Sequence, residues 1–589
     1  MSRTEKLSLK AFWEALEKRL AACSADELRA ILRALAQETT PTERQVFLDK
    51  LKPVKAGAAA QEALRQDDLL TDIDDLVAEI KEGTEGADYW EEEHWGDYYG
   101  DEEDSQGPYE EFIEPLSALF DRAEAVFDYG NFALARAAYQ KLFEEALQVE
   151  DDYGRGVQGG DLIDVDLDEA RARYLRAVYE TKRPAGRPQA LLEQMRRAQT
   201  WGVRSRPMLN DLIQISPAPL PDQDRFLKDW IAFLRKQSGP DADAWLREAI
   251  RLAQGTQGLA ELAQAEGKKR PRAYLDWFAA LESEDKHREI LSGAQAALKT
   301  LPARLPIRAT VADYLCAAAA RLNETEALRA GRWEAFSAAP TLLRLLDLWE
   351  AAPADKERIR LMQQAADHIK DYLAHPPRQR ESEMWWAEDR FEAPAWIDKS
   401  VLAHAYLLSQ DLDAAHQLAA REKVLGWSSS DNTQGLVAPF CLVLLAGKAP
   451  NALPANLKQL WQQRLQTSLG YGSWDDEDKA EASPRKRLER IYAEHVPHLS
   501  LSKERQEALL AWCLEVIRQR VEAIVGNQHR GSYDKAALLI GAGAETLRAR
   551  GEARQADALV EEMRQRFPRH RSFLAELDAV TQSARRSRR

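Results

Sequence analysis

Cysteine is scarce in this sequence. Four cysteines occur among 589 residues, at Cys23, Cys316, Cys441 and Cys513, and no two of them form a CxxC pair. This spacing excludes a disulfide framework and a zinc site built from neighbouring residues. We expect a reducing compartment in which the thiols act as small apolar side chains.

The sequence also lacks an apolar run long enough to cross a membrane. The longest candidate, around Leu436–Ala446, is interrupted by Pro439. The N-terminus is amphipathic and has no continuous apolar stretch of the kind found in signal peptides. We therefore expect a cytoplasmic protein with no membrane partner.

Common catalytic, phosphate-binding and metal-binding motifs are missing as well. The chain contains no GxSxG, no P-loop and no HExxH. His495 and His498 are close in sequence, but Pro497 should break the helix that would present both to a metal. We predict no catalytic residue, no metal ligand and no cofactor, so the sequence favours a protein that is not an enzyme.

What the sequence does contain is typical of helices. Ala, Leu, Glu, Arg and Gln are abundant, whereas the β-branched residues that disfavour helices are sparse. Charged residues make up 30% and apolar residues 45% of the chain, which is enough apolar surface for a core. The length exceeds what one core usually supports, so we expect an all-α protein with several domains or a repeat array.

The helical pattern divides the chain into four regions. The first is a small helical module in which Ser24 and Glu27 form a capping box for Ala25–Ala36. The second contains a helix that includes Thr71–Ile80, followed by an acidic, aromatic-rich flexible linker. The last two are helical-repeat regions. The four regions are 1–56, 57–112, 113–375 and 376–589.

The acidic stretch 82–114 is the most distinctive feature of the sequence. It contains no Lys or Arg, and aromatic residues alternate with its carboxylates. Three interpretations remain open: a solvated linker, a docking segment that meets a basic partner, or a mimic of the charge of a nucleic acid. As a docking segment, its partner-binding residues would be Trp90, Trp95, Tyr98 and Tyr99.

A second aromatic cluster lies near the middle of the chain. Trp385, Trp386 and Trp396 surround Arg390 in the sequence. Such a cluster fills a core between helices or anchors a partner in a groove, because Trp and Arg dominate binding hot spots.

One stretch resembles a tetratricopeptide repeat. Gly130-Asn131-Phe132, then Ala135 and Tyr139-Gln140-Lys141, is similar to the turn and second helix of that family. Weaker and irregularly spaced matches begin at Asn323, Gln410 and Gly551. The resemblance implies an α-solenoid of tetratricopeptide-like helix pairs with a groove for another protein.

Other segments are similar to the helical regions of bacterial SWIM-type zinc-finger proteins. These are Ala25–Arg29, Leu342–Ala352 and Arg566–Leu574. The CxC…CxH ligands of the zinc finger are missing, so only the helical scaffold carries over. The resemblance implies an alternative function, an accessory subunit of a nucleic-acid-processing or defence machine associated with a helicase or nuclease.

The leading functional expectation is a non-enzymatic scaffold or adaptor for protein partners. The net charge of −16 favours a partner with a basic surface and disfavours general binding to nucleic acid. Nucleic acid would bind only indirectly or through the basic tail Ala584–Arg589.

Overall fold

The computed structural model describes most of the chain as helices. The described residues are 15, 18–19, 21–38, 66–86, 110–149, 163, 165–201, 203, 205–303, 305–375, 397–469 and 483–586, and every regular element among them is helical. Contacts between Cα atoms divide the chain into two compact units, 1–261 and 262–589. The boundary falls inside helix α12 (Pro240–Glu266) at a different place from the break after residue 375 expected from the sequence.

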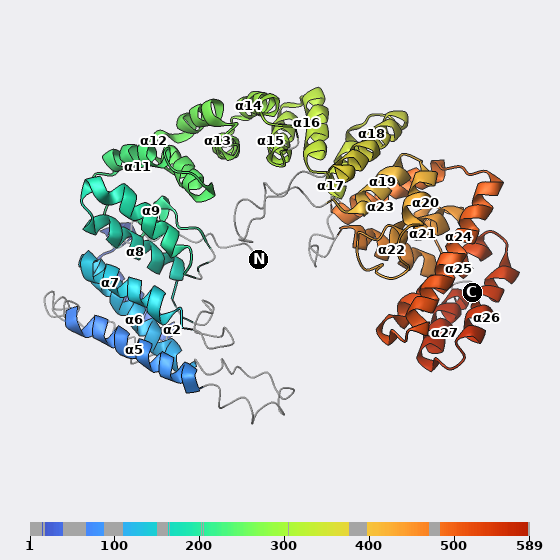
Figure 1. Ribbon diagram of the computed structural model, residues 1–589, viewed down its shortest axis with the longest axis horizontal. Helices are drawn as coiled ribbons and strands as arrows, with labels where there is room; N and C mark the ends of the chain where they lie inside the picture. Colours follow the sequence, from blue (N-terminus) through green and yellow to red (C-terminus); the bar gives the residue numbers. More distant parts are fainter. Residues whose placement is uncertain are drawn as a thin grey trace. The chain divides into compact units, whose positions relative to one another are not determined.

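The first unit packs helices that follow one another in the chain (Figure 1). Helix α5 contacts α6 and α7, α7 contacts α8, and α8 contacts α9 and α10. The elements are α2 (Ala25–Glu38), α5 (Gln66–Gly86), α6 (Glu110–Asp128), α7 (Phe132–Lys141), η2 (Leu142–Ala146), α8 (Leu167–Thr181), η3 (Pro184–Gly186), α9 (Arg187–Ala198), α10 (Leu209–Gln214), α11 (Gln223–Leu234) and the first part of α12.

The second unit begins with the same serial packing. Each helix from α13 to α19 contacts the next one along the chain. The elements are α13 (Arg272–Ser283), α14 (His287–Thr300), α15 (Ile307–Leu322), α16 (Thr325–Ala338), α17 (Leu342–Ala351), α18 (Asp355–Ala374), α19 (Lys399–Leu408), α20 (Leu412–Ala419), α21 (Gln434–Leu445), η5 (Pro450–Ala452), α22 (Ala455–Leu469), α23 (Pro484–His495), η7 (Val496–His498), α24 (Lys503–Val521), η8 (Glu522–Gly526), η9 (Arg530–Ser532), α25 (Tyr533–Ala549), α26 (Ala553–Arg566) and α27 (Arg571–Arg586).

The end of the second unit is a bundle around α25. This helix contacts α21, α22, α24, α26 and α27, and its residues from Ala536 to Leu547 are buried. Gly541 and Gly543 permit the close approach, because a Cβ at Gly541 would lie 3.0 Å from Asn456 Cγ and one at Gly543 would lie 2.5 Å from Ile517 Cδ1. Close packing therefore explains these glycines, as their place in an apolar helical pattern indicates.

Several helix pairs share one kind of turn. A residue with positive φ follows the first helix, and the amide of the next residue donates to a carbonyl five positions earlier, as in a Schellman motif. The bonds Asn131 N to Val126 O (3.1 Å) and Glu324 N to Ala319 O (2.8 Å) are examples. The residues with positive φ in these turns are Gly130, Asp285, Asn323, Gln410, Gln528 and Gly551. Since only a few residues join the two helices, each turn makes a helix hairpin.

Side chains cap the N-termini of several helices, and one of these caps was predicted from the sequence. Ser24 N donates to Glu27 Oε2 (2.7 Å) and Glu27 N donates to Ser24 Oγ (3.3 Å), which confirms the predicted capping box of α2. Asn131 accepts from Leu134 N at the start of α7. Asp166 accepts from the amides of Asp168 and Glu169 and so caps α8.

The expected bounds of the acidic linker are wrong, and Pro439 lies inside a helix. Both ends of the supposed linker 82–114 are helical, since α5 runs to Gly86 and α6 begins at Glu110. The buried apolar stripe of α6 already starts at Phe112. The acidic composition of this stretch did not indicate that its last residues belong to a packed helix. Pro439, which interrupts the longest apolar run of the sequence, lies inside α21, where burial of Leu436 to Val443 offsets one missing backbone hydrogen bond.

Buried carboxylates from distant helices cap two helix N-termini. Glu248 on α12 accepts from Leu209 N and Asn210 N, both at 2.8 Å, at the start of α10. Glu545 on α25 accepts from Leu457 N and Asn456 Nδ2, both at 2.8 Å, at the start of α22. These bonds satisfy amides that have no partner within their own helix.

Candidate functional site

The residues that the sequence nominates for partner binding fall outside the part of the chain that the structure describes. They are Trp90, Trp95, Tyr98 and Tyr99 in the acidic stretch, and Trp385, Trp386, Arg390 and Trp396 in the central cluster. Their role therefore stays a prediction.

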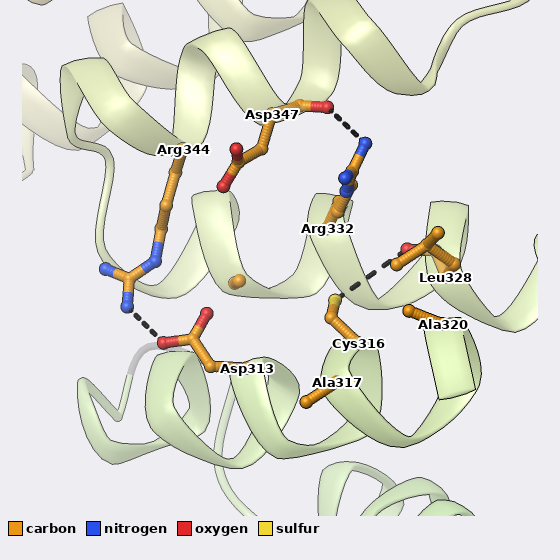
Figure 2. A pocket seen from close by; sticks show the side chains of 9 residues that line it. Asp313, Cys316, Ala317, Ala320, Leu328, Arg332, Arg344 and Asp347 are labelled. Carbon is orange, nitrogen blue, oxygen red and sulfur yellow. Dashed lines mark hydrogen bonds and ion pairs between the residues drawn. The ribbon is translucent and has the colours of Figure 1, made fainter. Parts of the chain in front are cut away.

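A groove opens between α15, α16 and α17 in the second unit. Figure 2 shows the side chains that line it. Helix α15 contributes a stripe at positions i, i+3, i+4 and i+7, because residues with this spacing share one helix face. The α15–α17 groove is lined by Asp313, Cys316, Ala317, Ala320, Leu328, Arg332, Ala335, Arg344 and Asp347 and encloses about 240 Å³.

The floor of the groove is formed by apolar side chains, most of them small. Ala317 and Ala320 are exposed on α15, and Leu328 of α16 is half-buried beside them. A glycine lets the two helices approach closely, since a Cβ at Gly331 would lie 2.5 Å from Leu315 Cδ2 and 2.8 Å from Cys316 Sγ. The result is a shallow apolar trough between two helices whose axes are held close together.

Charged side chains form the rim of the groove. Arg344 Nη2 lies 2.7 Å from Asp313 Oδ2, and Arg332 Nη1 donates to the backbone oxygen of Asp347 at 2.9 Å (Figure 2). Arg487 of α23 also pairs with the Asp347 carboxylate, at 2.5 Å. The rim thus holds acids and bases in mutual contact, and these pairs fix its shape rather than give it one sign of charge.

The cysteine in the groove is not activated as a nucleophile. Its Sγ donates to Leu328 O at 3.8 Å (Figure 2). Burial, with a smaller effect of Asp313, raises the pKa of the Cys316 thiol to about 12. Because the thiolate is the reactive form, this thiol is almost wholly protonated and inert at neutral pH.

The two histidines that are neighbours in sequence line one pocket but differ in burial. His495 ends α23 and is buried, with Nε2 3.1 Å from Leu407 O and its ring 5.2 Å from that of Trp349. Burial lowers its pKa, so the ring is neutral at pH 7. His498 is exposed on the following 3₁₀ turn. The break at Pro497 is as predicted.

The described residues form neither a metal-binding cluster nor a membrane-spanning helix. Within them no group of three or more His, Cys, Asp or Glu side chains is placed to hold a metal ion. None of the helices in the described ranges is long and apolar enough to cross a bilayer.

The sequence alone did not indicate the groove. Its one signal is the small-residue stripe of α15, in which Asp313, Cys316, Ala317 and Ala320 repeat at helical spacing. Such a stripe is also typical of a buried helix face, so the sequence could not separate an open face from a covered one.

Comparisons with known proteins do not assign the chain to a family. No protein-family model matches the sequence, and no curated protein matches it either. The geometry of the groove is therefore the main basis for a functional proposal.

Proposed function

We propose that the protein is a non-enzymatic interaction scaffold that binds a segment of a partner protein in the α15–α17 groove. The observation that carries the proposal is the exposed apolar floor between paired charged residues on a rigid helix hairpin. Interfaces commonly consist of an apolar centre surrounded by a polar rim. A single apolar side chain of the partner would fill the trough.

Serial packing of helix hairpins supports the scaffold proposal. Helices α13 to α18 each contact their neighbours in the chain, which is the arrangement that in an α-solenoid leaves one face open for binding. The net charge of −16 favours partners with a basic surface, because it accelerates their approach and repels acidic ones.

Blocking the floor of the groove tests this proposal. Ala320→Arg places a long cation over the trough, and because Ala320 is exposed the fold should tolerate it. Ala330→Arg is the matched control, since Ala330 is an exposed alanine of α16 outside the groove. Affinity capture from extracts of the source cells identifies stoichiometric partners, and calorimetry with each purified partner then measures its affinity for the three forms.

We expect Ala320→Arg to lower the affinity for a partner at least tenfold. Ala330→Arg should leave that affinity unchanged. Equal affinity for all three forms would remove the groove from the proposal. Failure to capture any stoichiometric partner with the intact protein would contradict the scaffold function as a whole.

A second arm tests the acidic stretch separately. Because 82–86 and 110–114 belong to helices, only residues 87–109 should be exchanged, for a neutral Gly/Ser segment of equal length. If this stretch docks a basic partner, the exchange lowers the association rate most at low salt. Unchanged association rates at low salt would reject its docking role and leave the groove proposal standing.

A further inference from the structure

A second cavity in the second unit is lined by cationic side chains from separate helices. It encloses about 240 Å³ between α22, the segment 425–428, α24 and the start of α25. Its charged or ionisable lining residues are Arg464, Arg520, His529 and Lys535, and no carboxylate is among the described residues that line it. We call it the Trp427 cavity after the indole that forms part of its wall.

Arg520 is the most unusual member of this lining. Its side chain is 7% exposed, yet none of the described carboxylates forms an ion pair with it. Its Nη1 donates to Val424 O at 2.5 Å, and its guanidinium carbon lies 4.3 Å from the centre of the Trp427 ring. A buried cation without a counter-charge is costly, so such a group is usually paired.

Arg464 adds a second positive charge at the same indole. Its guanidinium carbon lies 5.9 Å from the Trp427 ring centre, and its Nη1 donates to Trp427 O at 2.5 Å. Burial, with a further contribution from Arg464, lowers the pKa of Arg520 to about 9. Arg520 still carries its proton at pH 7, so the cavity holds at least two positive charges beside the indole.

The start of α25 faces the same cavity. Ser532 precedes this helix of 17 residues and Lys535 lies in its first turn, and both line the cavity. The first amides of a helix carry partial positive charge, which adds to the potential of the side chains. Lys535 Nζ forms no ion pair with any described residue and is exposed, so it is free to turn toward a ligand.

The opposite wall of the cavity is apolar. Leu460 of α22, Ile524 of η8, and Leu538 and Leu539 of α25 contribute to it. A ligand that satisfies both walls needs an anionic head and a compact apolar body.

We propose that the Trp427 cavity binds a small organic phosphate monoester. Two cations without an ion pair to any described residue, Arg520 and Lys535, match the two negative charges of a phosphate better than the single charge of a carboxylate. The apolar body packs on the leucines, while the guanidinium and ammonium groups hold the phosphate. This site is independent of the α15–α17 groove and does not rest on the scaffold proposal.

Isothermal titration calorimetry on the full chain at low ionic strength tests the proposal with three probes. Phenyl phosphate carries the head and the body, inorganic phosphate carries the head alone, and benzoate carries a body with a single charge. We expect phenyl phosphate to bind with one-to-one stoichiometry and more tightly than either of the others, with an affinity that falls as salt is added. Binding of benzoate as tight as that of phenyl phosphate would overturn the assignment to a dianion. Equal affinity for inorganic phosphate would overturn the role of the apolar wall.

Substitution of the exposed lysine assigns the binding to this cavity. Lys535→Gln should lower the affinity for phenyl phosphate about tenfold, because it removes one charge-assisted contact. Lys535→Arg should restore most of the affinity. Lys503→Gln is the matched control, since Lys503 is an exposed lysine in the first turn of α24 outside the cavity. No binding of phenyl phosphate to the intact protein, or equal loss in both Gln variants, would refute the site.

Discussion

Acid should destabilise the second unit through one buried histidine. His404 on α19 is fully buried, and its Nδ1 lies 2.7 Å from the hydroxyl oxygen of Tyr492 on α23. Its Nε2 has no partner among the described atoms. Burial lowers the pKa of His404 to about 3, so the native protein keeps this ring neutral at pH values where the unfolded chain binds a proton.

The sign and size of the effect follow from proton linkage. An unfolded histidine has a pKa of about 6.5, so its protonated fraction rises from about one tenth at pH 7.5 to about nine tenths at pH 5.5. The native His404 stays unprotonated over this range. The stabilisation is therefore complete well above pH 6.5 and declines as the pH falls toward 3. Between pH 7.5 and 5.5 the free energy of unfolding should drop by about 1.4 kcal/mol for His404 alone.

The assay compares the wild-type chain with His404→Asn by urea unfolding at both pH values. Asparagine does not titrate, and its amide can replace the contact with Tyr492. The variant starts less stable because its smaller side chain leaves a void. We expect its loss on acidification to be about 1.4 kcal/mol smaller than that of the wild type. His416 and His495, whose pKa values burial also lowers, contribute equally to both forms.

Hydrogen exchange assigns the effect to the right helices. Peptides that cover α19 and α23 should lose protection in acid in the wild type more than in the variant, after correction for the intrinsic pH dependence of exchange. If both forms lose the same stability between the two pH values, the native state protonates His404, and the reasoning from its burial is refuted.

Three other predictions concern Glu248, Gly331 and Cys316. Burial raises the pKa of Glu248 to about 7, so its contribution is complete below about pH 4.5 and disappears as the pH rises through 7. The first unit should gain about 2 kcal/mol from pH 7.5 to 5.5, and Glu248→Gln should abolish this trend. Gly331→Ala should destabilise the protein by about 1–2 kcal/mol in urea, because its Cβ clashes with α15, whereas Gly531→Ala, which has open space, should not. Iodoacetamide at pH 7.5 should label Cys316 about a thousandfold more slowly in the native than in the unfolded chain, as mass spectrometry would show.

Local signals predicted the helices well. A capping side chain acts within three residues of itself, so Ser24 indicates the helix that follows it. The turn at Gly130 was also found, since glycine adopts positive φ without strain. The equivalent turns at Asp285 and Gln528 were missed, because neither residue type marks a left-handed conformation in a sequence.

Sites assembled from several helices could not be predicted from the sequence. Helical spacing predicts which face of a helix is polar, but it does not predict which other helix that face meets. Arg464, Arg520 and Lys535 come from α22, α24 and α25, and nothing in their separate neighbourhoods connects them. The aromatic residues that did stand out in the sequence are contiguous, which is why composition alone could find them.

The buried charges of this fold follow one rule, and Arg520 departs from it. Buried carboxylates meet helix N-termini, as Glu248 and Glu545 do. Each of the other buried arginines in the described part of the chain pairs with a carboxylate, as Arg308 does with Glu334 at 2.6 Å and Arg247 with Asp243 at 2.5 Å. Each of these charges thus meets a group of opposite polarity, either the amides of a helix N-terminus or a carboxylate.

Arg520 instead donates to a carbonyl in the non-helical segment around Val424 and lies on the indole of Trp427, near a second arginine and the positive end of α25. Carboxylates stabilise the other buried arginines, whereas Arg520 forms no ion pair with any described residue. A charge that the fold itself does not compensate is best explained by a partner from outside the chain, and a phosphate is the partner that this surrounding would stabilise most.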